Sequence, residues 1–389
     1  MANSARLINT DFKVGILGGG QLGKMLAQAA SGWDLPIYAL DRDQTFPAAP
    51  VVRELHEGNF KDYDDVLAFG RQMDVLTIEI EHVNTDALLE LEKEGVVIHP
   101  RPQALITIKD KGLQKQFYAE RDIPTSDFRL WDSKEALLAA IADGTLSYPF
   151  VQKSRTAGYD GKGVAVIKSA DDGDKILEGP CLTEDLVDID KELAVVVARN
   201  PSGEIKAFPT VEMAFNPEAN LVEFLLCPAQ VKPEISRQAE ELALQVIEAF
   251  DVCGLLAVEL FLTTGGEILV NEVAPRPHNS GHHTIDSSYT SQFEQHLRGI
   301  LDLPLGSTRL KEPVGVMVNL LGAPGHTGTA SYEGLSDCLA MEGVYLHLYG
   351  KTQTRPFRKM GHATVIGDDV DATTERAREV MGMLRIVAR

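Results

Sequence analysis

Residues 150–168 read FVQKSRTAGYDGKGVAVIK, in which two apolar strand patterns enclose a glycine-rich loop. The strands, 150–153 and 164–168, predict a hairpin. Three of the residues 158–163 are glycines, and a backbone without Cβ atoms can lie flat over a triphosphate. Lys153, on the strand before the loop, could pair with the α- and β-phosphates. The alternative is a solvated hairpin with a surface lysine.

Two carboxylates lie within a second predicted hairpin. Apolar strands at 258–262 and 268–273 are joined by residues 263–267, which read Thr-Thr-Gly-Gly-Glu. Glu259 and Glu272 would face each other across it, and two such carboxylates repel unless a cation lies between them. Mg²⁺ prefers carboxylate and phosphate oxygens, so we predict a magnesium site here. The alternative is a pair of edge residues that face water.

An irregular polar loop, residues 274–282, follows the second carboxylate directly. It places Arg276, His278 and Asn279 next to the predicted metal site. A guanidinium with neighbouring donors binds anions well. We therefore expect an anion pocket beside the metal.

The first hundred residues alternate strand and helix patterns. An apolar strand at 13–17 runs into a glycine turn at 18–23, and a helix opens at 24–30. Further strands are predicted at 36–40 and 75–80. This alternation predicts an α/β domain with a parallel sheet and helices on both faces.

The glycine turn Gly18-x-Gly20-x-x-Gly23, with Asp41 after the next strand, also matches the dinucleotide fingerprint. An NAD-dependent oxidoreductase is therefore one interpretation. A glycine turn at a helix N-terminus holds any phosphate through free N–H groups, so a substrate's ribose phosphate is a second. A tight turn without a ligand is the third.

The acidic segment at residues 180–187 begins as an apolar strand pattern and ends in a polar link. Backbone groups at such an edge could read an adenine. Glu192, at the start of the next buried strand, could accept from ribose hydroxyls. Both roles are hypotheses about the nucleoside end of ATP.

Composition excludes several classes of protein. The 389 residues carry a formal net charge of −20, which would repel a nucleic-acid backbone. No uncharged run approaches the roughly 20 residues of a membrane helix, and the first residues lack a signal-peptide pattern. The four cysteines form no CxxC pair and are expected to be reduced and buried. We expect a cytoplasmic globular protein with small-molecule substrates and neither a nucleic-acid nor a membrane partner.

Taken together, the motifs resemble those of the 5-(carboxyamino)imidazole ribonucleotide synthases, an ATP-grasp family of purine biosynthesis. The resemblance extends over nearly the whole length, and its motifs lie at residues 18–23, 158–163, 271–282, 347–351 and 355–362. The chain departs from the family pattern at Val164, where Gln is common, and at Phe215, where His is common.

This resemblance implies a three-domain ATP-grasp fold and a homodimer. The domains would be a Rossmann-like substrate-binding domain at 1–106, an ATP-grasp domain with a glycine-loop lid at 107–302, and a β-rich C-terminal domain at 303–389. The implied reaction uses ATP and Mg²⁺ to convert bicarbonate into carboxyphosphate, which carboxylates 5-aminoimidazole ribonucleotide.

Site residues are also implied by the resemblance. Those that would hold ATP are Lys111, Lys153, Gly158, Tyr159, Asp160, Gly161, Lys162, Gly163, Glu184, Val187, Glu192, Asn271 and Glu272. Mg²⁺ would be held by Glu259 and Glu272. The aminoimidazole ribonucleotide would meet Gln21, Leu22, Glu81, Tyr159, Asp160, Arg276, His278 and Asn279, with its phosphate on Lys351 and Arg358. Catalytic roles would fall to Lys153, Asp160 and Arg276.

Three alternatives have different requirements. An NAD-dependent oxidoreductase needs neither the second glycine loop nor the paired carboxylates. A non-catalytic nucleotide-binding regulator has no need to retain Lys153, Glu259 and Glu272 together. A formate-dependent glycinamide ribonucleotide transformylase of the same superfamily would keep all of these features, so only the acceptor and the one-carbon donor separate it from the main interpretation.

Overall fold

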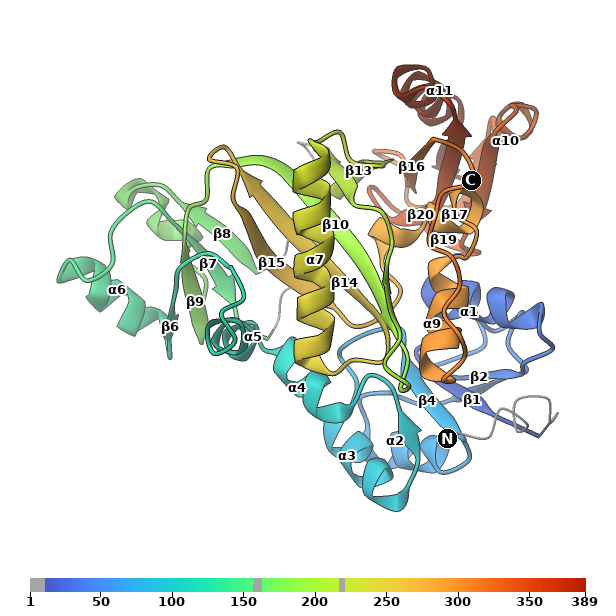
Figure 1. The fold of residues 1–389 in the computed structure, drawn as a ribbon, viewed down its shortest axis with the longest axis horizontal. Coiled ribbons are helices and arrows are strands. Elements are labelled where there is room, and N and C mark those ends of the chain that lie inside the picture. Colours follow the sequence, from blue (N-terminus) through green and yellow to red (C-terminus); the bar gives the residue numbers. More distant parts are fainter. Residues whose placement is uncertain (1–10, 157–162, 217–220) are drawn as a thin grey trace.

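The structure, a computed structural model, describes residues 11–156, 163–216 and 221–389. Figure 1 shows four parts: a blue N-terminal domain, a green lid subdomain, a central sheet crossed by the long helix α7, and a C-terminal part in orange and red. The lid lies at one end of the central sheet, and the C-terminal part lies at the other end. This arrangement is the α/β architecture that the sequence predicted.

The N-terminal domain is a five-stranded parallel sheet in the order β3-β2-β1-β4-β5. Its elements are β1 Val14–Leu17, α1 Gln21–Ser31, β2 Ile37–Asp41, β3 Glu54–Glu57, α2 Tyr63–Gly70, β4 Val75–Ile78, α3 Thr85–Glu94, β5 Val97–Ile98 and α4 Pro102–Lys109. The expected parallel sheet is confirmed, although the sequence predicted neither β3 nor the two-residue strand β5. Because β1 and β4 are neighbours, the residues that follow them meet at one edge of the sheet.

The lid subdomain is a four-stranded antiparallel sheet in the order β6-β9-β7-β8. The elements of this part are α5 Lys111–Ala119, β6 Phe128–Trp131, α6 Lys134–Ala142, β7 Phe150–Ser154, β8 Val164–Ile167, the 3₁₀ helix η2 Ala170–Lys175 and β9 Cys181–Asp185. The predicted hairpin is confirmed, since β7 and β8 pair with Lys153 opposite Val164.

The large central sheet has nine strands, with the order β15-β14-β10-β12-β13-β16-β20-β18 and β11 paired to β10. Its first part contains β10 Ile189–Arg199, β11 Ile205–Ala207, β12 Val211–Asn216, β13 Leu221–Cys227, α7 Pro233–Phe250, β14 Gly254–Thr263, β15 Ile268–Ala274, the 3₁₀ helix η3 Asn279–Gly281, α8 Thr284–Ser287 and α9 Gln292–Ile300. Helix α7 covers one face because Ala239, Leu242, Val246 and Phe250 recur at helical spacing and are all buried.

The C-terminal part continues the same sheet. Strand β16 pairs antiparallel with β13, so the sheet crosses the boundary expected between residues 302 and 303. The elements are β16 Val314–Leu321, β17 Gly328–Glu333, α10 Leu335–Leu339, β18 Val344–Leu348, β19 Gln353–Thr354, β20 Lys359–Gly367, α11 Val370–Met383 and β21 Arg385–Ala388. A small second sheet has the order β19-β17-β21.

Two further expectations can be compared with the structure. All four cysteines are free and buried, as predicted. Over the ranges that the structure describes, no helix has both the length and the hydropathy of a membrane span.

His296 on α9 joins the N-terminal domain to the central sheet. Its Nε2 lies 2.9 Å from Thr77 Oγ1 on β4, and the Leu255 N–H on β14 donates to its Nδ1 at 3.2 Å. Since Nδ1 accepts, the ring proton lies on Nε2 and is donated to Thr77. Burial, together with the nearby His99, lowers the pKa of His296 to about 3.

Acid is expected to weaken the fold through this histidine. Because the folded-state pKa lies below the ordinary value of 6.5, the unfolded chain binds more protons in the window between them, and stability falls as the pH drops. The loss is up to about 1.4 kcal/mol of unfolding free energy per pH unit. Urea unfolding between pH about 7 and about 5 measures this slope. His296→Gln should reduce the slope by this amount and leave the contributions of the other buried histidines, His99, His282, His283 and His362, whose pKa values burial also lowers. An unchanged slope would contradict the assignment.

Candidate active site

The two carboxylates predicted to share a metal do face each other. Glu259 and Glu272 are paired across β14 and β15. Glu272 forms an ion pair with Lys111 at the start of α5, and this cation lowers the pKa of Glu272. Burial raises the pKa of Glu259, and the charges of Glu272 and Glu192 raise it further. Glu272 thus has a positively charged partner, whereas Glu259 is partly buried beside two other carboxylates.

This donor set fits a hard divalent cation. Glu259 has no lysine or arginine ion-pair partner among the described residues; the His278 ring lies beside it, with Nε2 3.5 Å from Oε1. A cation beside both carboxylates would relieve the repulsion that raises the pKa of Glu259. Glu259 and Glu272 therefore fit a divalent cation as a pair of carboxylate ligands.

A buried cluster of alternating charge lies next to this pair. Glu184, at the end of β9, is 4% exposed and forms ion pairs with Lys153 on β7 (2.7 Å) and Lys115 on α5 (2.6 Å). Lys153 also donates to Asn271 Oδ1 at 2.8 Å, which links the lid to β15. The structure thus brings together the predicted ATP residues Lys111, Lys153, Glu184, Asn271 and Glu272.

The two lysines of this cluster differ in how many donors remain. Lys115 has three protein partners: it forms an ion pair with Glu184 and donates to Thr125 Oγ1 and Ser126 Oγ. Lys153 contacts only Glu184 and Asn271 within the described ranges, so one hydrogen remains for a ligand. The sequence singled out Lys153 and missed Lys115, whose signal was a basic residue on the buried face of a helix.

Glu192 lies on β10 beside this cluster. Burial raises its pKa to about 6, while Lys153 lowers it and Glu272 raises it. A carboxyl poised near neutrality accepts hydrogen bonds from hydroxyls readily. The position is compatible with the predicted ribose contact.

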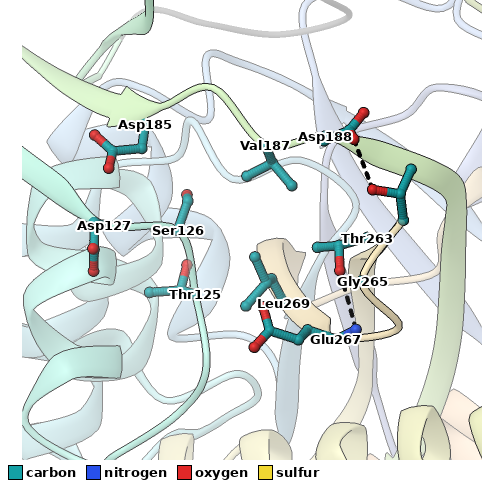
Figure 2. Close-up of a pocket in the computed structure, with 11 residues that line it drawn as sticks. Thr125, Ser126, Asp127, Asp185, Val187, Asp188, Thr263, Gly265, Glu267 and Leu269 are labelled. Atoms are coloured by element: carbon teal, nitrogen blue, oxygen red, sulfur yellow. Dashed lines mark hydrogen bonds between the residues drawn. The ribbon is translucent and has the colours of Figure 1, made fainter. Parts of the chain in front are cut away.

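A pocket of about 460 Å³ lies where the lid joins the central sheet, and Figure 2 shows its lining. Val187 and Leu269 point into it, whereas four acidic residues surround it: Asp127, Asp185, Asp188 and Glu267. Asp188 Oδ2 accepts from the Thr264 hydroxyl at 2.7 Å, and this bond connects the segment after β9 to the turn between β14 and β15. This lining repels polyphosphate, so only the uncharged base of a nucleotide would suit it.

The polar loop after β15 faces the N-terminal domain. Arg276 Nε lies 2.8 Å from Glu81 Oε1, which joins two residues predicted to bind substrate. The side-chain amide nitrogen and oxygen of Asn279 are buried and have no hydrogen-bond partner within the described residues. Buried polar atoms without partners are costly, and a bound ligand is one common explanation. His278, in the same loop, contacts Glu259 and so brings the loop next to the carboxylate pair.

The first glycine loop differs from the expectation. The N–H groups of Gly20 and Gly23 donate to the two carboxylate oxygens of Glu79, and the Gly19 N–H donates to Asp41 Oδ2 at 2.8 Å. These three donors are occupied by carboxylates of the chain, which contradicts the dinucleotide interpretation, in which a pyrophosphate takes them. A contact of Gln21 or Leu22 with the substrate stays a prediction. Asp41 is 2% exposed and unavailable to a ribose, which also contradicts the NAD interpretation.

The side chain of the loop residue Gln21 reaches the C-terminal part. Lys351 Nζ donates to Gln21 Oε1 and to the Lys359 carbonyl oxygen, both at 2.6 Å. Leu22 packs into the apolar cluster under α1. Arg358 donates to the Gln353 carbonyl oxygen at 2.6 Å, and burial together with Arg355 lowers its pKa. Lys351 thus meets the predicted substrate residue Gln21. Within the described ranges, no hydrogen bond or ion pair joins Arg358 to a predicted substrate residue.

Several predicted residues lie outside the described ranges. They are Gly158, Tyr159, Asp160, Gly161 and Lys162, and their predicted roles stay predictions. Gly163 is described: it has φ of 79° and its carbonyl oxygen accepts from the Ser154 N–H at 2.8 Å.

Family models match three consecutive regions of the chain. Residues 12–109 match the ribonucleotide synthetase preATP-grasp domain, residues 116–293 the ATP-grasp domain, and residues 315–376 the phosphoribosylaminoimidazole carboxylase C-terminal domain. These regions correspond to the N-terminal domain, to the lid with most of the central sheet, and to the C-terminal part.

Relatives of known name match most of the chain. The N5-carboxyaminoimidazole ribonucleotide synthase of Synechococcus elongatus is 37% identical over 95% of this chain and 93% of its own length. The chloroplastic phosphoribosylaminoimidazole carboxylase of Vigna aconitifolia is 38% identical over 92% of this chain, which spans only 65% of that relative.

Solved structures agree with these relatives. The N5-carboxyaminoimidazole ribonucleotide synthetase from Thermotoga maritima has a TM-score of 0.88 and 42% identity, covering 97% of this chain and 100% of its own. The synthase from Aspergillus clavatus, solved in complex with ADP and 5-aminoimidazole ribonucleotide, has a TM-score of 0.87 and 33% identity, covering 96% and 99%.

Proposed function

Because this chain belongs to the N5-carboxyaminoimidazole ribonucleotide synthase family of ATP-grasp enzymes, we propose that it carboxylates 5-aminoimidazole ribonucleotide with ATP and bicarbonate. The observation that carries this proposal is the meeting of three groups at one place. These are the Glu259–Glu272 pair, the Lys153–Asn271 contact and the loop that carries Arg276 and a buried, unpartnered Asn279.

Bicarbonate is a poor electrophile, and phosphorylation supplies the missing leaving group. A bicarbonate oxygen attacks the γ-phosphorus of ATP, the bond to the β-phosphate oxygen breaks, and ADP and carboxyphosphate result. The substrate amine then attacks the carboxyphosphate carbon, the C–O bond to phosphate breaks, and the amine loses a proton. Phosphate is released and the new C–N bond carries the carboxylate.

The roles of the protein groups are to position the reactants and offset charge. Lys153 has one donor left for the phosphates. Arg276 and Asn279 would hold bicarbonate, and Arg276 is kept in place by Glu81. Asp160 stays the predicted group that orients the amine or takes its proton. The residues 158–163 would close over carboxyphosphate to exclude water.

Mg²⁺ would be held by Glu259 and Glu272. When bound, it would neutralise charge on the transferred phosphoryl group. Lys351, which reaches Gln21, would receive the substrate phosphate, and Arg358 stays a predicted second phosphate contact. A homodimer and a cytoplasmic location are also part of the proposal, and they rest on the resemblance and on the sequence.

The proposal is tested by ADP release with each acceptor and one-carbon donor in turn. We expect turnover only with 5-aminoimidazole ribonucleotide and bicarbonate together. Turnover with glycinamide ribonucleotide and formate instead would establish the transformylase alternative. ATP hydrolysis that is independent of any acceptor would overturn both assignments.

A further inference from the structure

We propose that Glu79 is a built-in anion: its carboxylate occupies the phosphate position of the glycine loop at residues 18–23 and thereby positions Gln21 opposite Lys351. Glu79 follows β4 and is partly buried. No sequence motif indicated it. The inference goes beyond the proposed function and depends on it only for its kinetic test.

The hydrogen bonds show an anion seated at a helix N-terminus. Helix α1 begins at Gln21, and its N-cap residue, Gly20, has no side chain to cap the helix. Glu79 takes that role from another strand, since its two oxygens accept from the Gly20 and Gly23 N–H groups, the second at 2.5 Å. In dinucleotide-binding folds the pyrophosphate takes these same donors.

The glycines themselves fit Glu79. Gly20 has φ of −79°, which any residue can adopt, so its backbone does not require glycine. A Cβ built there would lie 2.6 Å from Glu79 Oε1. At Gly18, whose φ is 111°, a Cβ would overlap Glu79 Cγ. The fingerprint therefore makes room for an internal carboxylate rather than for a nucleotide.

The same carboxylate connects to the proposed substrate site. Gln21 follows the capped turn directly, and its Oε1 accepts from Lys351 Nζ at 2.6 Å. Lys24, one turn later, donates to the Leu348 carbonyl oxygen at 3.0 Å. Glu81, two residues after Glu79, faces Arg276. Glu79 is thus a positioning residue: it holds the glycine loop between the Gln21–Lys351 contact and the Glu81–Arg276 contact.

One consequence concerns specificity. With Glu79 in place, a ligand phosphate at the Gly20 and Gly23 N–H groups would meet occupied donors and a like charge. The phosphate of a substrate that binds near Gln21 is therefore directed to the lysine of the C-terminal part. We infer that Glu79 makes the loop selective against dinucleotides.

The first test uses thermal unfolding without substrates. Glu79→Ala removes the four heavy atoms of an acetate ion, and we expect Tm to fall by about 2–4 °C. Sodium acetate should restore Tm in a saturable way, whereas equimolar sodium chloride should not. The wild type and Glu92→Ala, an exposed glutamate on α3, should show no acetate effect. A folded Glu79→Ala protein that acetate does not stabilise would overturn the proposal.

The second test is kinetic and uses Glu79→Gln, which keeps the shape of the side chain. Its amide oxygen accepts one N–H, but its NH₂ group cannot accept the other. We expect KM for 5-aminoimidazole ribonucleotide to rise about tenfold with KM for ATP unchanged. If both KM values change equally, or if neither changes, the positioning role is overturned. This test remains decisive even if Glu79→Ala fails to fold. Wild-type protein without turnover would count against the proposed function alone, because the thermal test needs no substrate.

Discussion

Glu272→Gln is expected to lower kcat for ADP formation by about 10²- to 10³-fold. Two losses combine in this variant. The amide is a weaker ligand for a hard cation, and it removes the charge that pairs with Lys111. Lys111 would then lack its carboxylate partner, and its positive charge would attract the phosphates of ATP more strongly. KM for ATP should therefore change less than kcat.

The fold should survive this change because the Glu272 side chain is 41% exposed. Circular dichroism and Tm would verify it, and Glu248→Gln, an exposed residue on α7, is the matched control. Activity within a factor of about two of the wild type would remove the carboxylate pair from the mechanism.

Lys153→Met is the second substitution with a large expected effect. The buried ammonium joins Glu184 on the lid to Asn271 on the central sheet, and these two leave one of its hydrogens without a partner among the described residues. Without it, the phosphates lose a cation and the lid loses a link. We expect kcat/KM for ATP to fall by about 10²-fold or more. Steady-state kinetics measure this, with Lys175→Met, exposed on the same subdomain, as the control.

The neighbouring lysine makes the test sharper. Lys115 is held by an ion pair and two hydrogen bonds within the protein, so Lys115→Met should chiefly cost stability, by about 3–5 kcal/mol. For Lys153→Met, the loss in kcat/KM for ATP, expressed as a free energy, should exceed the loss in the free energy of unfolding. The same ratio of losses in both variants would show that Lys153 is structural, like Lys115.

The sequence predicted those features that depend on local pattern. Both hairpins were predicted because alternating or apolar runs flank glycine-rich turns, and the turn at residues 263–267 brings Glu259 opposite Glu272. The parallel sheet was predicted for the same reason. Strand β3 was missed because its sequence, Glu-Leu-His-Glu, has one buried residue and charged ends at the edge of the sheet.

Long-range contacts with backbone groups left no signal in the sequence. Glu79 accepts from N–H groups 59 and 56 residues away, and every residue has such a group. The glycine fingerprint was correctly found, but the dinucleotide interpretation of it was wrong, because the Gly20 and Gly23 N–H groups donate to Glu79. Only the fold shows that the end of β4 lies against the turn after β1.

The pairing of β13 with β16 has a consequence for recombinant fragments. The pairing joins Phe224–Cys227 to Gly315–Val318, on either side of the sequence boundary between the ATP-grasp and C-terminal family regions. A protein cut between residues 302 and 303 would leave an open edge on each piece. The edge on β16 consists almost entirely of buried apolar residues, and such an edge is a template for aggregation. The two pieces should therefore be produced together, as one chain or by co-expression, rather than as separate domains.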